Sequence, residues 1–198
     1  RSDIIIELDR ELDDSYFKKL ESLMLHPELK RNIRIVYTPL HGSGITCVPE
    51  ALKRFHFKDV LTVPDQEVPD GNFPTVKSPN PEDPESFKIA KSFADNHGGD
   101  LILATDPDCD RVSMSVKEQG EWVNVNGNQM GSLLFEYILS SLYKKGKLNN
   151  SSYVVKTIVT TDLQKDIAKH YGCHCFETLT GFKWIASLIE EMKKNEDS

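Results

Sequence analysis

The chain has 198 residues, enough for one large domain or two smaller ones. Its charged fraction of 28% and hydrophobic fraction of 38% are those of an ordinary soluble protein, and no apolar run approaches the roughly 20 residues of a membrane span. A net charge of −7 without a Lys/Arg-rich block argues against nucleic acid or an anionic membrane as a partner. Four cysteines do not form a disulfide framework, so we expect a cytoplasmic protein. Because the chain begins at Arg1 rather than Met, we expect it to be a fragment of a longer protein.

Strands and helices alternate along the first part of the chain. Apolar residues at helical spacing, ended by His26-Pro27, predict a helix over residues 12–24. Strands are expected at 33–38, 59–63, 101–103 and 112–116, and helices at 45–55 and 84–96. A hairpin turn at 118–121 leads into a strand at 122–125. Repeated proline in the loop 64–84 favours a shaped loop over a floppy one.

The second part of the chain repeats this alternation. The pattern predicts helices at 126–144, 161–171 and 184–192 and strands at 152–159 and 173–177. Strand and helix in alternation indicate parallel strands with helices outside the sheet. The expected fold class is α/β, with two successive three-layer α/β/α domains built on mainly parallel mixed sheets. We place the domains at residues 1–120 and 121–198.

Three aspartates follow the apolar run Leu101-Ile102-Leu103 at alternating positions. Asp106, Asp108 and Asp110 point the same way if the loop is roughly extended, and their like charges then repel one another. A hard divalent cation such as Mg²⁺ takes carboxylate ligands and removes this repulsion. Arg111 follows with a planar fork suited to a phosphate or carboxylate. The stretch therefore predicts a metal site that meets a phosphorylated ligand at the carboxyl end of a strand.

Three other interpretations of this stretch compete with a metal site. An EF-hand loop counted from Asp106 would need Gly and Glu where Arg111 and Lys117 stand, so that interpretation fails. A phosphatase-type aspartyl nucleophile would need Thr or Val in place of Asp110, which makes it a weak alternative. A solvated acidic turn without a binding function is the third alternative, since Asp and Pro are common in turns.

The turn after the first strand is a second candidate. His41 lies at the end of this strand, at the same expected sheet edge as Asp106, and is a candidate substrate-binding residue. Gly42 and Gly44 either bind an anion with backbone amides at a helix start or serve only to form a tight turn. Two glycines do not decide between these alternatives.

Three weaker features remain open at this point. A zinc interpretation of His170, Cys173, His174 and Cys175 matches no common spacing, and buried structural thiols are the usual fate of cysteine. Cys109 lies among carboxylates that discourage its thiolate, which argues against a nucleophile. Lys183 is either a surface lysine at a helix start or a cleft residue that contacts phosphate or carries a proton.

Taken together, these segments resemble the α-D-phosphohexomutase superfamily of phosphoglucomutases and phosphomannomutases. The matching segments are Thr38-Pro39-Leu40-His41-Gly42-Ser43-Gly44, Asp70-Gly71-Asn72-Phe73-Pro74 with Pro79-Asn80-Pro81-Glu82, Asp106 to Arg111, Gly127-Asn128-Gln129-Met130-Gly131, and Thr180-Gly181-Phe182-Lys183. They occur in family order over nearly the whole chain, and their amino-acid sequences are most similar to those of the phosphoglucomutase/phosphopentomutase branch. Pro107 stands where the family's metal loop usually has Gly, which stiffens the loop without removing a ligand.

The resemblance implies an internal fragment that covers domain 2 and most of domain 3 of a four-domain enzyme. By family analogy, Asp106, Asp108 and Asp110 bind Mg²⁺, and Arg111 lies against the active-site phosphate. Gly181 and Lys183 would face the sugar cleft, with Lys183 a candidate acid/base or phosphate contact. The whole enzyme would move a phosphoryl group between the 1- and 6-positions, or the 5-position of a pentose, through a phosphoserine and a sugar bisphosphate.

Several family motifs are absent from the 198 residues. No Thr-Ala-Ser-His-Asn-Pro serine loop, Gly-Glu-Glu-Ser-Gly sugar loop or Arg-x-Ser-Gly-Thr phosphate loop occurs in the sequence. The missing domains 1 and 4 would be partners in the same polypeptide, and the isolated fragment is expected to be inactive. Phosphomannomutase and phosphopentomutase remain alternatives, as do a non-catalytic sugar-phosphate module and an aspartyl-phosphate phosphatase.

Overall fold

The computed structural model describes residues 10–196, and the chain divides into two compact units between Asn126 and Gly127. Each unit has its own sheet and its own hydrophobic core. The expected α/β class with helices on the faces of mixed sheets is confirmed. Residues 1–9 and 197–198, the outer ends of the two expected domains, lie outside the described part.

A five-stranded mixed sheet forms the first unit, with strand order β2-β1-β3-β4-β5. The strands are β1 (Arg34–Thr38), β2 (Asp59–Thr62), β3 (Leu101–Thr105), β4 (Val112–Glu118) and β5 (Glu121–Val125). β1 pairs in parallel with β2 and β3, whereas β4 and β5 complete the sheet as antiparallel strands. Because β1 and β3 are parallel neighbours, the loops that follow them leave from the same edge of the sheet.

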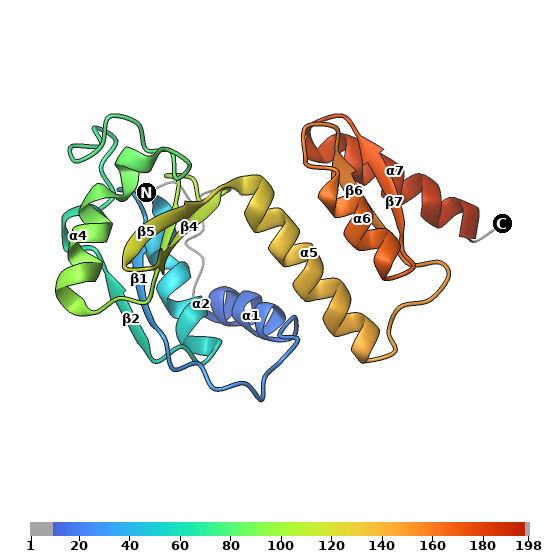
Figure 1. Ribbon diagram of the computed structural model, residues 1–198, viewed down its shortest axis with the longest axis horizontal. Helices are drawn as coiled ribbons and strands as arrows, with labels where there is room; N and C mark the ends of the chain where they lie inside the picture. The colour runs from blue at the N-terminus through green and yellow to red at the C-terminus, as the bar shows by residue number, and fades with distance from the viewer. Residues whose placement is uncertain (1–9, 197–198) are drawn as a thin grey trace, which may run out of the picture. The chain divides into compact units, whose positions relative to one another are not determined.

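Helices precede β1 and lie in the connections from β1 to β2 and from β2 to β3 (Figure 1). The α-helices are α1 (Arg10–Glu21), α2 (Val48–Arg54), α3 (Pro64–Glu67) and α4 (Lys88–His97). The 3₁₀ helices are η1 (Ser43–Thr46) and η2 (Pro84–Phe87). The main core packs side chains of β1 and β3 against α4 and η2, and Val36, Phe87, Ala90 and Ile102 are fully buried in it. A left-handed glycine, Gly98, ends α4.

Helix α1 is attached to α2 mainly through Arg54. The Arg54 guanidinium forms ion pairs with Asp14 and, at 2.7 Å, with Glu50, and it lies 4.7 Å from the centre of the Phe17 ring. Phe17 is the buried residue of this helix. Asp14 of α1 and Glu50 of α2 thus share one cationic partner.

The two compact units meet between Asn126 and Gly127, whereas the expected domains meet after Gly120. β5 pairs with β4 from Met114↔Val125 to Glu118↔Glu121, so the hairpin belongs entirely to the first sheet. Trp122 of β5 also packs against the first core and donates through Nε1 to Asp95 Oδ1 at 2.9 Å. These long-range contacts move the division to the start of the following helix.

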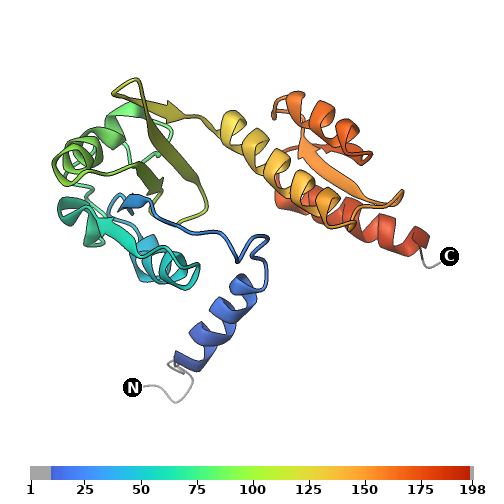
Figure 2. The ribbon, with the colours of Figure 1, turned by 60° about the horizontal axis from the view of Figure 1, so that its bottom comes forward.

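The second unit contains two parallel strands and three helices. They are α5 (Gly127–Lys144), β6 (Tyr153–Thr157), α6 (Leu163–His170), β7 (His174–Thr178) and α7 (Phe182–Glu196). Leu139 of α5, Ala168 of α6 and Cys173 form its core. Figure 2 shows β6 between α6 and α7, which gives this unit its layered arrangement.

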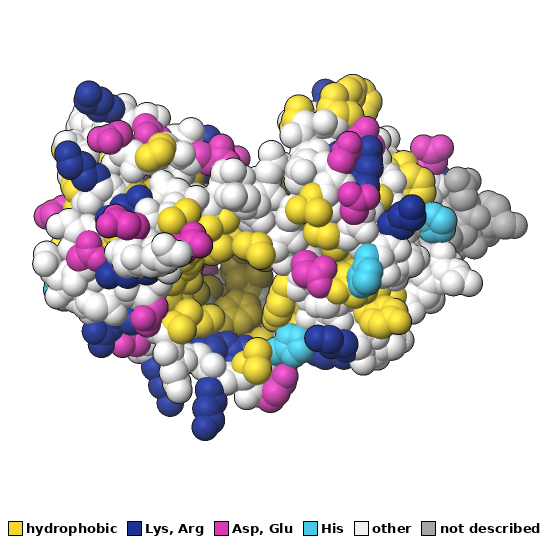
Figure 3. Space-filling view, in the orientation of Figure 1, with side chains coloured by type: hydrophobic (Ala, Val, Ile, Leu, Met, Phe, Trp, Pro, Cys, Tyr) yellow, Lys and Arg dark blue, Asp and Glu magenta, His cyan; other side chains and the backbone are white. Residues whose placement is uncertain are grey.

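No helix among residues 10–196 is long and apolar enough to cross a membrane. On the face of the described residues that Figure 3 draws, basic and acidic side chains are interspersed without a continuous basic surface.

The two polar atoms of one half-buried side chain of β5, Asn124, are buried without partners. Neither Oδ1 nor Nδ2 of Asn124 has a hydrogen bond to any described residue. We expect Asn124→Leu, which keeps the branching and removes both polar atoms, to raise the free energy of unfolding by about 1 kcal/mol. Urea unfolding followed by circular dichroism checks this, with Asn96→Leu on the exposed face of α4 as control. A loss of stability in Asn124→Leu would contradict the expectation.

Candidate functional site

The candidate site lies at the carboxyl ends of β1 and β3. The chain runs from β1 through α2 to β2 and returns through α4 to β3, so β1 has a strand on either side. Open α/β sheets bind ligands where the strand order reverses in this way, because neighbouring loops diverge there. The loops that follow are residues 39–44 and residues 106–111.

Asp106, Asp108 and Asp110 come together as the sequence predicted. One carboxylate oxygen from each lies within 4.8 Å of the others, and this is the one group of metal-capable side chains among residues 10–196. Asp106 is buried, whereas Asp108 and Asp110 are exposed. Oxygen donors at this spacing, two of them open to solvent, fit a hard divalent cation. The zinc interpretation of His170, Cys173, His174 and Cys175 finds no support.

Arg111 neutralises the buried carboxylate of Asp106. Its backbone N–H donates to Asp106 Oδ1 at 2.9 Å and its Nε–H to Asp106 Oδ2 at 2.8 Å. Burial by itself would raise the pKa of Asp106, but the hydrogen bonds and charge of Arg111 outweigh burial, and the pKa lies below its ordinary value. Asp106 is therefore ionised at neutral pH.

The third carboxylate is pushed in the opposite direction. A hydrogen bond shared with Asp106, together with the charge of Asp108, raises the pKa of Asp110. The repulsion within the group is therefore incompletely relieved by Arg111. A divalent cation would relieve it, and the metal role of the group stays a prediction.

Close packing of the two loops fixes the acidic group in place. Ser43 donates to Pro107 O twice, from its backbone N–H at 2.8 Å and from its hydroxyl at 3.0 Å. A Cβ on Gly42 would lie 2.3 Å from Pro107 Cα, and one on Gly44 would lie 2.3 Å from the Tyr37 hydroxyl. The glycines thus permit the close approach of the loops. This favours the tight-turn alternative over the anion-binding one.

His41 holds the turn after β1 to the proline-rich loop. It is buried, with Nδ1 3.1 Å from Val68 O and Nε2 2.9 Å from the Thr75 hydroxyl. Because a carbonyl oxygen only accepts, Nδ1 donates in its contact with Val68 O. The Thr75 hydroxyl also accepts from buried Gln66, whose Oε1 accepts from Thr38 at 2.8 Å. These contacts give His41 a structural task, and its role in binding substrate stays a prediction.

Cys109 has little nucleophilic character in this loop. Burial raises its pKa, and the charges of Asp106 and Asp108 act in the same direction. The backbone at Cys109 is left-handed, with φ 62°. This left-handed residue turns the chain between Asp108 and Asp110.

The Gly181–Lys183 segment lies in the second unit. Gly181 has φ 125°, a conformation that favours glycine, and its carbonyl accepts from Trp184 N at 3.1 Å. Lys183 is exposed in the first turn of α7, with Nζ 5.1 Å from the centre of a Trp184 ring. The segment follows the carboxyl end of β7. The two expected roles of Lys183, phosphate contact and proton carrier, remain predictions.

Sequence reasoning missed the interactions of two residues, one within β6 and one in the loop between α3 and η2. Lys156 of β6 is buried and pairs with Glu177 Oε2 at 2.7 Å and Asp162 Oδ1 at 3.3 Å. A lysine inside an otherwise apolar strand pattern is the signal that could have revealed it. Asn80 accepts from Arg111 Nη1 at 3.4 Å, and no local pattern points to that contact.

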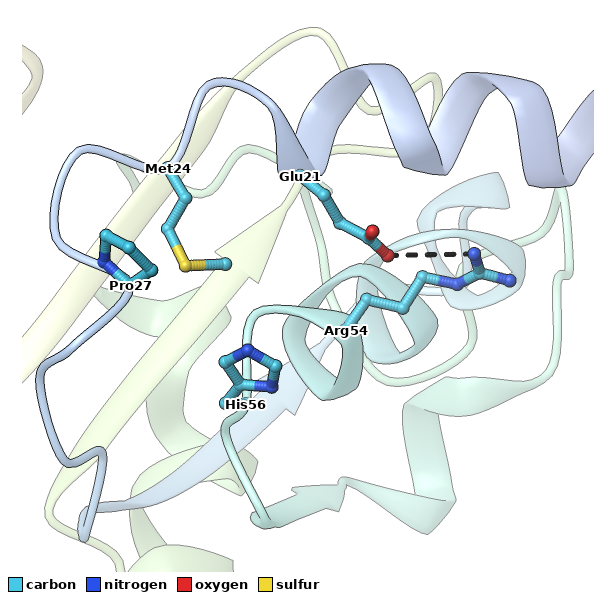
Figure 4. Close-up of a pocket in the computed structure, with 5 residues that line it drawn as sticks. All are labelled: Glu21, Met24, Pro27, Arg54 and His56. Carbon is cyan, nitrogen blue, oxygen red and sulfur yellow. Dashed lines mark ion pairs between the residues drawn. The ribbon is translucent and has the colours of Figure 1, made fainter.

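A separate pocket of ≈ 470 Å³ lies beside α1 and is lined by Glu21, Met24, Pro27, Arg54 and His56. Figure 4 shows Arg54 reaching toward Glu21, 3.7 Å away. Since Arg54 also pairs with Asp14 and Glu50, its charge is neutralised by the protein. The pocket therefore lacks the free charge and the metal-ligand group present at the carboxyl ends of β1 and β3.

The pairing of Asp106 with Arg111 predicts a pH-dependent stability difference. We expect Arg111→Met to lower the free energy of unfolding by about 1–2 kcal/mol at pH 7, allowing for solvent screening of the half-exposed guanidinium. Because the pKa of Asp106 is lowered in the folded state, the pair contributes above the unfolded pKa and is lost as pH falls through the folded value. Urea unfolding at neutral and acidic pH measures the difference.

Arg31→Met is the control for this experiment, because Arg31 donates to the carbonyls of His26 and Leu29 and has no acidic partner among its described contacts. Its effect should not depend on the ionisation of a carboxylate. A stability loss in Arg111→Met that persists unchanged into acid would count against the ion pair.

The chain matches the models of two domains of one protein family. The family model of phosphoglucomutase/phosphomannomutase alpha/beta/alpha domain II matches residues 14–120, and that of domain III matches residues 126–196. A probable phosphoribomutase of Schizosaccharomyces pombe is 39% identical over 83% of this chain and 28% of its own length. The glucose 1,6-bisphosphate synthase of Homo sapiens is 37% identical over 91% of this chain and 30% of its own length.

Solved structures share the fold. The crystal structure of a putative phosphomannomutase from Thermus thermophilus superposes with a TM-score of 0.70 at 24% identity, covering 93% of this chain and 39% of that one. The chain spans about a third of the length of the curated relatives it matches. It belongs to the phosphoglucomutase/phosphomannomutase family, of which it contains domains II and III.

Proposed function

We propose that the chain supplies the magnesium site and part of the sugar-phosphate cleft of a phosphosugar mutase. The whole enzyme would move a phosphoryl group between the 1-position and the 6-position (or 5-position) of a sugar, through a phosphoserine and a bisphosphate intermediate. The clustering of three carboxylates beside Arg111, within a family of sugar-phosphate mutases, carries this proposal.

Asp106, Asp108 and Asp110 would hold Mg²⁺, which when bound supplies Lewis-acid stabilisation of phosphoryl charge. A relative of the same fold, the N-acetylphosphoglucosamine mutase of Aspergillus fumigatus, was solved in complex with GlcNAc-6P and magnesium at 16% identity and a TM-score of 0.59. Arg111 would present the outer edge of its guanidinium to a phosphoryl oxygen while its Nε remains on Asp106. His41, Gly181 and Lys183 are proposed to border the substrate, with Lys183 as acid/base or phosphate contact.

The group to be transferred would come from elsewhere in the polypeptide. We propose that domains 1 and 4 of the family supply the phosphoserine and the second phosphate loop, and that the protein works in the cytoplasm. Phosphomannomutase and phosphopentomutase activities are alternatives, because the expected sugar-binding loop does not occur in this sequence. Phosphopentomutase and phosphoglucomutase both stand among the relatives, at 33% identity.

A non-catalytic sugar-phosphate module is the alternative from another class. A serine in the expected loop of the parent protein supports the enzyme, and its absence supports the module. An aspartyl-phosphate phosphatase is less favoured, because both oxygens of Asp106 accept hydrogen bonds from Arg111. Beryllofluoride trapped on Asp106 would revive that alternative.

Metal binding by the chain tests the acidic group directly. We expect calorimetry to show weak Mg²⁺ binding, because the phosphoserine oxygen is absent, and no measurable binding in Asp108→Ala. The variant should stay folded, with a free energy of unfolding within about 0.5 kcal/mol of wild type or above it, since one repelling charge is gone. In the full-length parent the same change should abolish activity. Activity within a few-fold of wild type would refute the metal role.

The isolated chain should show no mutase turnover with glucose 1-phosphate and glucose 1,6-bisphosphate. Phosphoryl transfer depends on positioning the phosphate and neutralising its charge, and this chain lacks the group that is transferred. A coupled assay for glucose 6-phosphate measures this outcome. Turnover well above background, lost in Asp108→Ala, would show that the fragment is sufficient.

A further inference from the structure

We infer that Asn80 is a positioning residue, which holds the Arg111 guanidinium in the orientation that receives a phosphoryl oxygen. This inference rests on the proposed function, in which Arg111 contacts phosphate. It assigns a task to the proline-rich loop between α3 and η2, residues 68–83.

The guanidinium of Arg111 has two fixed points. Its Nε–H donates to Asp106 Oδ2 at 2.8 Å, and its Nη1 donates to Asn80 Oδ1 at 3.4 Å. A single bond at Nε leaves the plane of the fork free to tilt, whereas a second bond at Nη1 selects one plane. Half of the Arg111 side chain, 54%, is exposed, so packing alone does not hold it. The remaining N–H groups at Nη1 and Nη2 would form the pair that meets an oxyanion.

Asn80 is itself held rigidly. Its Oδ1 also accepts from Glu82 N at 3.0 Å, and its backbone carbonyl accepts from Asp83 N at 3.0 Å and from the Ser86 hydroxyl at 2.8 Å. Ser86 and the neighbouring Pro81 are buried. A side chain fixed at both its amide oxygen and its backbone can transmit a defined position to Arg111, which a mobile loop residue could not do.

The other end of the same loop is anchored at the carboxyl end of β1. Asp70 N donates to His41 O at 3.1 Å, and Thr75 contacts the His41 ring. The loop therefore spans from the turn after β1 to the arginine after β3. Two ends fixed to the same sheet edge give it the stiffness that positioning needs.

The test uses the isolated chain, with inorganic phosphate as the probe in the presence of Mg²⁺. The Arg111 Nε–H cross-peak in ¹H–¹⁵N spectra, assigned by its loss in Arg111→Met, reports both the order of the guanidinium and phosphate binding. We expect Asn80→Ala to weaken phosphate binding about three- to tenfold and to speed exchange of the Nε proton. Asn80→Asp, which keeps the acceptor oxygen, should restore the slow exchange, although its charge opposes phosphate.

Asp83→Ala is the matched control, because it removes the cap that Asp83 Oδ1 forms with Glu85 N in the same loop without touching Arg111. It should leave both the phosphate affinity and the Arg111 signal unchanged. Equal effects of Asn80→Ala and Asp83→Ala, or wild-type behaviour of Asn80→Ala, would overturn the positioning role. A wild-type Arg111 signal that phosphate does not move would instead refute the contact assumed in the proposed function.

Discussion

The buried carboxylate of Asp106 is the constraint around which the first unit is arranged. An ionised carboxylate in this position is costly unless charge and hydrogen bonds compensate it, and Arg111 supplies both from five residues further along the chain. The same arginine then has its outer edge free at the surface. One interaction thus stabilises the loop after β3 and orients the group that we propose meets phosphate.

The neighbouring loops make that arrangement rigid. Gly42 lets the turn after β1 lie against Pro107, and His41 ties this turn to the proline-rich loop. Functional side chains on loops are precise only when a rigid scaffold holds the loops. Here the scaffold is the parallel pairing of β1 and β3, which brings both loops to one edge.

The second unit also has charged side chains in or near its parallel strands, but they are lysines. Its two parallel strands end near a buried lysine, Lys156, and an exposed lysine, Lys183. The buried lysine is satisfied by Glu177 and Asp162, so it joins strands and helix within the unit. The exposed lysine lies in the first turn of α7. The two units match domains II and III of the phosphoglucomutase/phosphomannomutase family.

Local sequence patterns determined the alternation of strands and helices, the fold class and the acidic group, because periodicity, turn residues and charge repulsion act between near neighbours. The extent of the first unit was decided by the pairing of β5 with β4, and the tasks of His41 and Asn80 by contacts with residues distant in the chain. Such contacts depend on which loops the sheet brings to one edge. No local sequence pattern encodes which loops become neighbours, and only the tertiary structure decides it.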